Sequence, residues 1–177
     1  AGTLADLRAM PADELLSAVM KQNNGWGYGP GLDGYFMPRK VADIYAAGEQ
    51  SGIPLLAGWT SAELGMAVAL NAQKPTMETF KQQLKKQFGE RFEDALKVYT
   101  ADTDQQAMES VAALGSDLFI SYSTWKWIEA HSATSKAPVY RYRFDRTMPG
   151  DPASEFGAVH AVDIEYAFNT LDSKTVD

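Results

Sequence analysis

Apolar residues recur at helical spacing in the middle of the chain, and the clearest run is Met77, Phe80, Leu84 and Phe88. Residues three and four apart lie on one face of an α-helix, so this run predicts an amphipathic helix over 77–88. Thr76 stands before the run as an N-cap, and Gly89 after it is suited to end the helix.

Further helices are predicted on both sides of this one. Residues 13–21 carry Leu15, Leu16 and Val19 on one face, and Pro11 precedes them where a missing N–H costs little. Phe92, Leu96 and Tyr99 mark the next helix, and residues 103–131 predict one or two more. Asp117 is expected to cap a helix that begins near Leu118.

Two segments have the character of strands. In residues 139–144, Arg141 and Arg143 alternate with aromatic residues, which is the period of a strand with two unlike faces. Residues 53–57 form a short apolar run between Gly52 and Gly58, which predicts a buried strand closed by Gly58. Glu63 then lies just past a strand end, where polar side chains collect in open α/β sheets.

Composition excludes several classes of partner. The chain is 45% apolar and 22% charged, as globular domains are, and its net charge of −7 argues against nucleic acid and anionic membrane surfaces. No apolar run approaches the roughly 20 residues of a membrane span. The absence of cysteine excludes disulfides and thiolate metal ligands within this sequence, and the two distant histidines make a zinc site improbable.

Glu63 and His160 are the candidate chemical groups. Imidazole titrates near neutrality, so His160 is suited to take a hydroxyl proton and return it to a leaving group. A carboxylate such as Glu63 behind the ring would fix its tautomer and stabilise the imidazolium. On the residues alone, a helix-start charge for Glu63 and a structural or surface role for His160 remain the common alternatives.

Several segments, in order, resemble type B carboxylesterases, the cholinesterase and para-nitrobenzyl esterase family. The residues 7–16 are similar to the family's Leu-Arg-x-x-Pro-x-x-x-Leu helix, and 30–38 to its Pro-x-x-Asp-Gly turn. The segment from Gly58 to Gly65 resembles Gly-x-x-x-x-Glu-Gly, with Glu63 on the acid, and Gly157-Ala-Val-His160 resembles Gly-x-x-His. Ala161 stands where the family frequently has glycine.

The resemblance implies an α/β-hydrolase fold, of which 1–177 would form a single region from the C-terminal portion: a few strands of the central sheet plus several helices. In that fold the triad runs Ser, then Asp or Glu, then His along the chain. The sequence contains no Gly-x-Ser-x-Gly, so the nucleophile is expected upstream of Ala1, in a missing N-terminal half that this chain would need as its partner.

Trp26, Tyr28 and Met66 are the substrate-binding candidates. The resemblance places Trp26 and Tyr28 among acyl-pocket residues shortly before the Pro-x-x-Asp-Gly turn, where a tryptophan would offer a large apolar wall. A surface aromatic is an equally good interpretation of both. Met66 resembles a pocket position just after the acid turn, although methionine on an amphipathic helix is more often core filler.

The resemblance therefore implies a serine ester hydrolase acting on small-molecule carboxylic esters, with no metal or organic cofactor. Glu63 and His160 would be its catalytic residues, and the isolated chain is expected to be inactive because it lacks the nucleophile. The alternative is a non-catalytic binding or adhesion protein with a cholinesterase-like fold. Retention of both Glu63 and His160 favours the enzyme.

Overall fold

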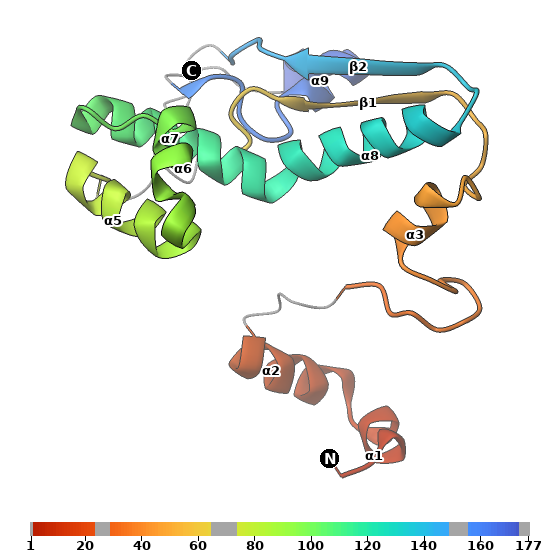
Figure 1. Cartoon of the computed structure of the whole chain (residues 1–177). Helices are drawn as coiled ribbons and strands as arrows, with labels where there is room; N and C mark the ends of the chain where they lie inside the picture. The colour runs from red at the N-terminus through yellow and green to blue at the C-terminus, as the bar shows by residue number, and fades with distance from the viewer. Residues whose placement is uncertain (1, 24–28, 65–73, 149–155, 174–177) are drawn as a thin grey trace. The chain divides into compact units, whose positions relative to one another are not determined.

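The computed structural model describes residues 2–23, 29–64, 74–148 and 156–173, and the chain divides into two units, Ala1–Ile44 and Tyr45–Asp177 (Figure 1). The first unit holds the helices α1 (Leu4–Ala9) and α2 (Ala12–Asn23), and α3 (Val41–Ala46) begins in it. The helix predicted over 13–21 is thus confirmed as part of α2. None of the described residues of this unit is buried.

Polar side chains organise the first unit locally at two places. Thr3 and Asp6 form a capping box at the start of α1, which satisfies backbone N–H groups that the helix leaves unpaired. The Asp33 carboxylate accepts hydrogen bonds from the backbone N–H groups of Tyr35 and Met37, at 3.0 and 2.8 Å. The aspartate therefore closes its own turn.

The second unit has a helical core. It contains α5 (Met77–Phe88), the 3₁₀ turn η1 (Gly89–Arg91), α6 (Phe92–Val98), α7 (Asp104–Ser116), the π-helical turn η2 (Asp117–Ser121) and α8 (Tyr122–Thr134). The predicted bounds of α5 are confirmed, with Thr76 as N-cap and Gly89 as C-cap. Phe80 and Leu84 are fully buried, and they cluster with Ala95, Ala107 and Leu114.

The expected cap at Asp117 is wrong. Its backbone is helical, and α7, η2 and α8 follow one another without a break, so no helix starts there. The carboxylate instead accepts a 2.7 Å hydrogen bond from the Tyr99 hydroxyl just beyond α6. A cap needs extended backbone, which the continuous helix does not provide.

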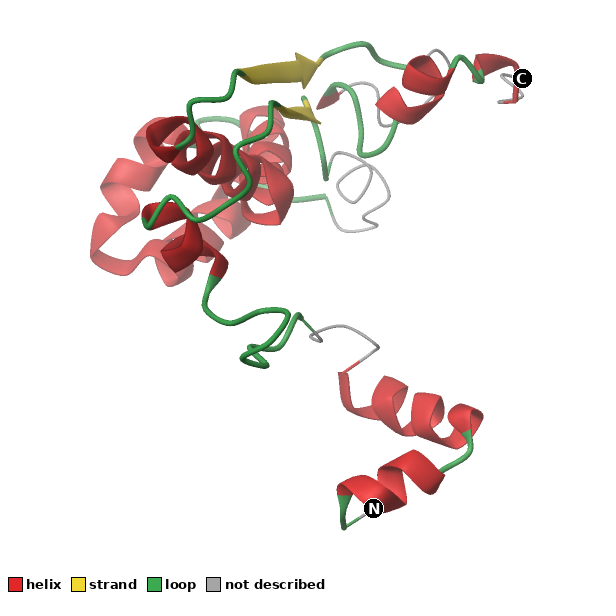
Figure 2. Ribbon diagram, turned by 90° about the vertical axis from the view of Figure 1, so that its right-hand side faces the viewer, coloured by secondary structure: helices red, strands yellow, loops and turns green. Residues whose placement is uncertain are grey.

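A parallel two-stranded sheet lies beside these helices (Figure 2). Strand β1 (Leu55–Thr60) pairs with β2 (Val139–Phe144), from Leu55 opposite Val139 to Thr60 opposite Phe144. The strand predicted over 139–144 is confirmed. The buried strand predicted over 53–57 is wrong in its bounds and its burial, because β1 begins at Leu55 and continues through Gly58, and both Ile53 and Leu56 are exposed. A side chain on Gly58 would place its Cβ 2.2 Å from the Tyr142 carbonyl oxygen, so glycine here permits close strand approach instead of ending the strand.

Helices lie on both faces of this sheet. On one face α8 packs along the strands, and the Nε2 atom of its buried His131 lies 3.0 Å from the Ile53 carbonyl oxygen. On the other face the helix α9 (Asp163–Phe168) places the Tyr166 ring 5.2 Å from that of Phe144. The 3₁₀ turn η4 (Leu171–Ser173) follows. The carboxyl end of β1 leads directly into the turn that holds Glu63, and His160 follows β2 along the chain.

Candidate active site

The turn after β1 positions Glu63. The backbone N–H of Thr60 donates to Glu63 Oε1 at 2.7 Å, and the carboxylate is 3% exposed. A carboxylate is stable in such surroundings only when its oxygens receive hydrogen bonds. Next to it, the N–H of Leu64 donates to the hydroxyl of Ser116 on α7 at 3.3 Å, so the turn is also tied to the helices.

The turn that carries His160 is joined to the turn after β1. Ala62 forms a parallel bridge with Val159, and its N–H donates to the Ala158 carbonyl at 2.8 Å. In return the N–H of Ala158 donates to the Ser61 hydroxyl at 2.8 Å. Ala158 and Val159 are buried and anchor the turn in the core, whereas the side chain of His160 is 52% exposed.

Backbone conformation fixes the direction of this turn. Gly157 has φ of +120°, which favours glycine, and a Cβ there would lie 2.6 Å from Ser61 Oγ. Ala161 follows His160 with φ of 66°, a left-handed conformation that is unfavourable for alanine. The turn is therefore held in an unusual shape on either side of the histidine.

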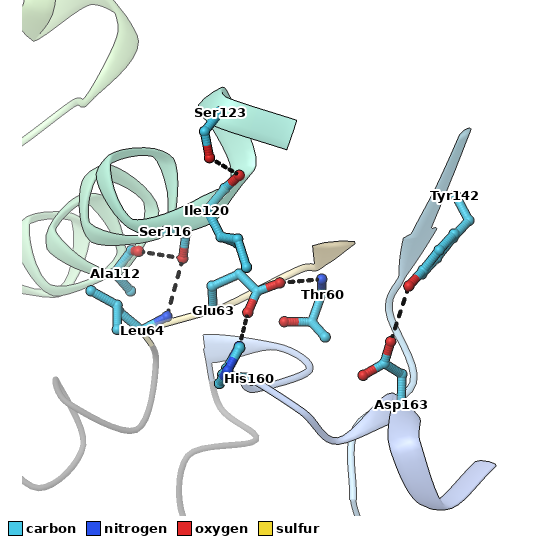
Figure 3. A network of polar contacts seen from close by, with 10 residues as sticks. All are labelled: Thr60, Glu63, Leu64, Ala112, Ser116, Ile120, Ser123, Tyr142, His160 and Asp163. Atoms are coloured by element: carbon cyan, nitrogen blue, oxygen red, sulfur yellow. Dashed lines mark hydrogen bonds and ion pairs between the residues drawn. The ribbon is translucent and has the colours of Figure 1, made fainter. Parts of the chain in front are cut away.

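Glu63 and His160, 97 residues apart in the chain, meet at this junction (Figure 3). Nδ1 of His160 lies 2.6 Å from Glu63 Oε2, a distance typical of a charge-assisted hydrogen bond. With the proton on Nδ1, the ring donates to the carboxylate and leaves Nε2 as a free acceptor. Nε2 makes no hydrogen bond with any residue that the structure describes.

This arrangement is suited to proton transfer. A buried carboxylate that receives the Nδ1 proton holds one tautomer and stabilises the ring when it becomes positively charged. The exposed Nε2 is then able to take a proton from a hydroxyl group and to give it back. The two groups that the sequence singles out for chemistry are thus brought together.

The other predicted site residues, Trp26, Tyr28 and Met66, lie outside the described residues. The structure adds Ser61, Ser116 and Phe119, which sequence reasoning did not connect to the site. The Phe119 ring lies against that of His160, with the centroids 5.2 Å apart and the planes at 75°. Phe119 precedes the histidine by some forty positions, and no local pattern links residues so far apart.

An open cavity of about 680 Å³ lies elsewhere in this unit. Its wall includes Trp59 on β1, Arg141 on β2 and Trp125 on α8. Neither Glu63 nor His160 lines it, so this cavity is separate from the candidate site.

In the ranges that the structure describes, no three His, Cys, Asp or Glu side chains are grouped so that they would hold a metal ion. Among the same residues, no helix combines the length and the apolar character needed to cross a bilayer.

Comparison with solved structures identifies the fold as that of an α/β-hydrolase. The carboxylesterase EST55 of Geobacillus stearothermophilus, in its structure at pH 6.2, is 27% identical, matches with a TM-score of 0.70 and covers 96% of this chain. Its structure at pH 6.8 gives a TM-score of 0.69 over 99% of the chain at 26% identity. In each case the match covers 35% of the solved chain.

Within that fold, the chain belongs to the carboxylesterase family, whose sequence profile matches residues 3–176. It is 30% identical over 148 residues to the fumonisin B1 esterase of Sphingopyxis macrogoltabida, covering 84% of this chain and 26% of the relative. It is 27% identical over 180 residues to the para-nitrobenzyl esterase of Bacillus subtilis (strain 168), covering 97% of this chain and 35% of that enzyme. The predicted family is confirmed, and the chain spans about a third or less of these relatives.

Proposed function

We propose that this chain supplies the acid and the general base of a serine carboxylic ester hydrolase. The observation that carries the proposal is the 2.6 Å contact between His160 Nδ1 and buried Glu63 Oε2, with Nε2 left free among the described residues. Membership of the carboxylesterase family supports the same reaction. His160 is the general base and acid, and Glu63 orients it.

The reaction divides into two similar halves. As a serine Oγ attacks the ester carbonyl carbon, His160 Nε2 takes the hydroxyl proton, and the positive ring is stabilised by Glu63. When the tetrahedral intermediate collapses, the bond from carbon to the alcohol oxygen breaks and Nε2 gives its proton to that oxygen. Water then attacks the acyl-enzyme by the same route, which releases the carboxylic acid and restores the serine.

The nucleophile and the oxyanion donors belong, in this proposal, to a segment upstream of Ala1. The sequence contains no Gly-x-Ser-x-Gly, and the relatives are about three times as long as the part that matches. We propose that the upstream segment forms the missing N-terminal half of the same fold. The isolated chain is then inactive toward esters.

The edge of strand β1 that is unpaired among the described residues supports the proposal that an upstream segment packs against this chain. One edge pairs with β2, and no described strand pairs with the other. Unpaired edges are normally protected by charged residues or proline, yet residues 55–60 contain neither. Leu56 on the same strand is 69% exposed. A neighbouring strand from the upstream segment would cover this edge.

The substrate class is a small-molecule carboxylic ester. The names of the relatives mention fumonisin B1 and para-nitrobenzyl esters, and the compounds they name differ widely. Trp26, Tyr28 and Met66 stay predictions as substrate-binding residues.

The test compares the 177-residue chain with the longer polypeptide that includes the upstream segment, using a series of p-nitrophenyl esters. We expect turnover and covalent labelling by a fluorophosphonate probe only in the longer chain. Replacement His160→Asn in the longer chain should abolish turnover. Robust hydrolysis by the 177 residues alone, blocked by the probe, would contradict the proposal. An upstream segment in which another residue replaces the serine of Gly-x-Ser-x-Gly would also contradict it, and would favour a binding or adhesion role.

A further inference from the structure

The turn η2 is an unusual element at a functional position. Five residues, Asp117–Ser121, form a π-helical turn between α7 and α8. Such turns are rare in proteins and occur frequently at functional sites, because the wider turn redirects the side chains it carries. The Tyr99 hydroxyl donates to Asp117, and this 2.7 Å hydrogen bond holds the start of the turn against the end of α6.

The helix around this turn contacts both loops of the candidate site. Ser116, immediately before it, receives the N–H of Leu64 at 3.3 Å and donates to the Ala112 carbonyl at 2.8 Å (Figure 3). This links the loop of Glu63 to α7. Phe119, within the turn, lies against the ring of His160 in the T-shaped, edge-to-face geometry that aromatic pairs prefer.

One hydrogen bond does not fix the orientation of a histidine ring. The torsion that turns the ring about its bond to Cβ has a broad distribution, and Glu63 restrains only the Nδ1 side. The side chain of His160 is 52% exposed, so the buried anchors of its backbone turn do not confine the ring. A second contact is needed to hold Nε2 in one direction.

We infer that Phe119 is a positioning residue for His160, and that the π-helical turn serves to bring its ring to the histidine. This inference rests on the function proposed above. Glu63 fixes the Nδ1 side, and Phe119 limits rotation of the ring, so that Nε2 stays aligned with the nucleophile. Misplacement of a reacting group by about 1 Å can cost about 100-fold in rate.

The kinetic test uses the longer, active polypeptide with two substitutions at one position. Phe119→Leu keeps an apolar side chain but removes the ring, and Phe119→Tyr keeps the ring. We expect Phe119→Leu to lower kcat by roughly 10- to 100-fold with KM within about twofold, and Phe119→Tyr to retain most of the activity. Tyr122→Leu is the matched control, because that ring lies one turn further along and contacts Trp125 instead.

A double-mutant cycle with Glu63→Gln separates positioning from a general structural effect. If both residues hold the same ring, their effects on kcat are not additive, because once either is lost the ring is already misoriented. Additive losses, an unchanged kcat in Phe119→Leu, or an equal loss in Tyr122→Leu would each overturn the inference. Unfolding midpoints, measured for every variant, should differ little between Phe119→Leu and Tyr122→Leu.

A second measurement does not depend on turnover. In a ¹H–¹³C NMR spectrum of the histidine rings, the His160 signal, assigned with His160→Asn, should carry a ring-current shift that disappears in Phe119→Leu. Buried His131 is the internal reference and should not move. If the longer chain hydrolyses no ester, the proposed function fails, and this spectrum still decides whether Phe119 orients the ring. An unchanged His160 signal would overturn the inference even in an active enzyme.

Discussion

The Ser61 hydroxyl accepts a hydrogen bond from the backbone N–H of Ala158 at 2.8 Å, which joins the turn after β1 to the turn before His160. The reverse bond from the Ala62 N–H to the Ala158 carbonyl has the same length. Because each turn satisfies backbone groups of the other, the two behave as one unit. Displacement of either turn should therefore separate Glu63 from His160.

Gly157→Ala tests this junction. The new Cβ would lie 2.6 Å from Ser61 Oγ on a backbone with φ of +120°, so both strain and a clash are introduced. Gly48→Ala is the control, because its φ of +68° adds strain while its nearest neighbour lies at 3.6 Å. We expect Gly48→Ala to cost about 1–2 kcal/mol of unfolding free energy and Gly157→Ala to cost more. In the longer polypeptide, Gly157→Ala should also abolish esterase activity, whereas Gly48→Ala should not. Equal effects of the two variants on activity would contradict this.

Glu63→Gln in the longer polypeptide should reduce kcat by about 10⁴-fold, as loss of the orienting acid does in related triads. The amide would present its NH₂ to Nδ1, which places the ring proton on Nε2 and removes the general base. Glu109→Gln is the control, because Glu109 is an exposed residue that accepts a hydrogen bond from Gln105. Steady-state kinetics should show little change in the control, and comparable activity in the two variants would rule out Glu63 as the acid.

Gly58→Ala should weaken the pairing of β1 with β2. Its Cβ would meet the Tyr142 carbonyl oxygen at 2.2 Å and the Tyr142 ring at 2.5 Å, and backbone cannot move aside as a flexible side chain does. A cost of about 1–3 kcal/mol or more is expected from denaturant unfolding. Gly52→Ala, with no atom within 4 Å of its added Cβ, should be nearly neutral. A stable Gly58→Ala variant would show that the register is wrong.

Ala161→Gly should stabilise the protein. Alanine at φ of 66° is strained, whereas glycine adopts this conformation readily. The gain is expected to be up to about 1 kcal/mol, because the extra freedom of glycine in the unfolded chain offsets part of it. Thermal or denaturant unfolding measures the change, with Ala137→Gly as the control that should destabilise slightly.

Tyr99 should make the unfolding free energy depend on pH in the alkaline range. Burial, and then the hydrogen bond to Asp117 with its negative charge, raise the pKa of Tyr99 above its ordinary value. Because the folded-state pKa is the higher one, the stabilisation is complete below the unfolded pKa of about 10 and is lost as pH rises toward the folded pKa. The unfolding free energy should therefore fall above about pH 10.

Tyr99→Phe should remove this alkaline loss and cost about 1–2 kcal/mol at neutral pH, where the hydrogen bond is intact. Tyr140→Phe is the control, since that exposed side chain makes no hydrogen bond with the described residues. An identical dependence of unfolding on pH in the wild type and in Tyr99→Phe would argue against the Tyr99–Asp117 bond.

Local patterns predicted the elements well where local chemistry decides them. Thr76 and Gly89 mark the ends of α5 because a capping hydroxyl and a glycine with positive φ act within one turn. The strand end predicted at Gly58 was wrong because glycine has two roles in strands: it ends short strands, and it permits close approach of a neighbouring strand. Only the position of Tyr142, far along the chain, shows which role applies.

The pair of Glu63 and His160 was predictable from motifs, but the structures that hold it were not. Ser61 and Ser116 are common polar residues whose partners, Ala158 and Leu64, lie far away in the sequence. Phe119 follows the helical pattern like any other apolar residue, and the π-helical turn that redirects it leaves no periodic signal. Contacts between distant segments require the fold.

The parallel register of β1 and β2 has a consequence for folding kinetics. Leu55 meets Val139 only after the intervening chain, including α5 to α8, has been brought back across the sheet. Contacts between residues so far apart form slowly, because the entropy of closing a long loop is lost before the pairing is gained. We therefore expect the helical core around Phe80 and Leu84 to form early, and the junction of Glu63 with His160 to be among the last contacts made. When the longer polypeptide refolds, recovery of esterase activity should then lag behind recovery of helix content.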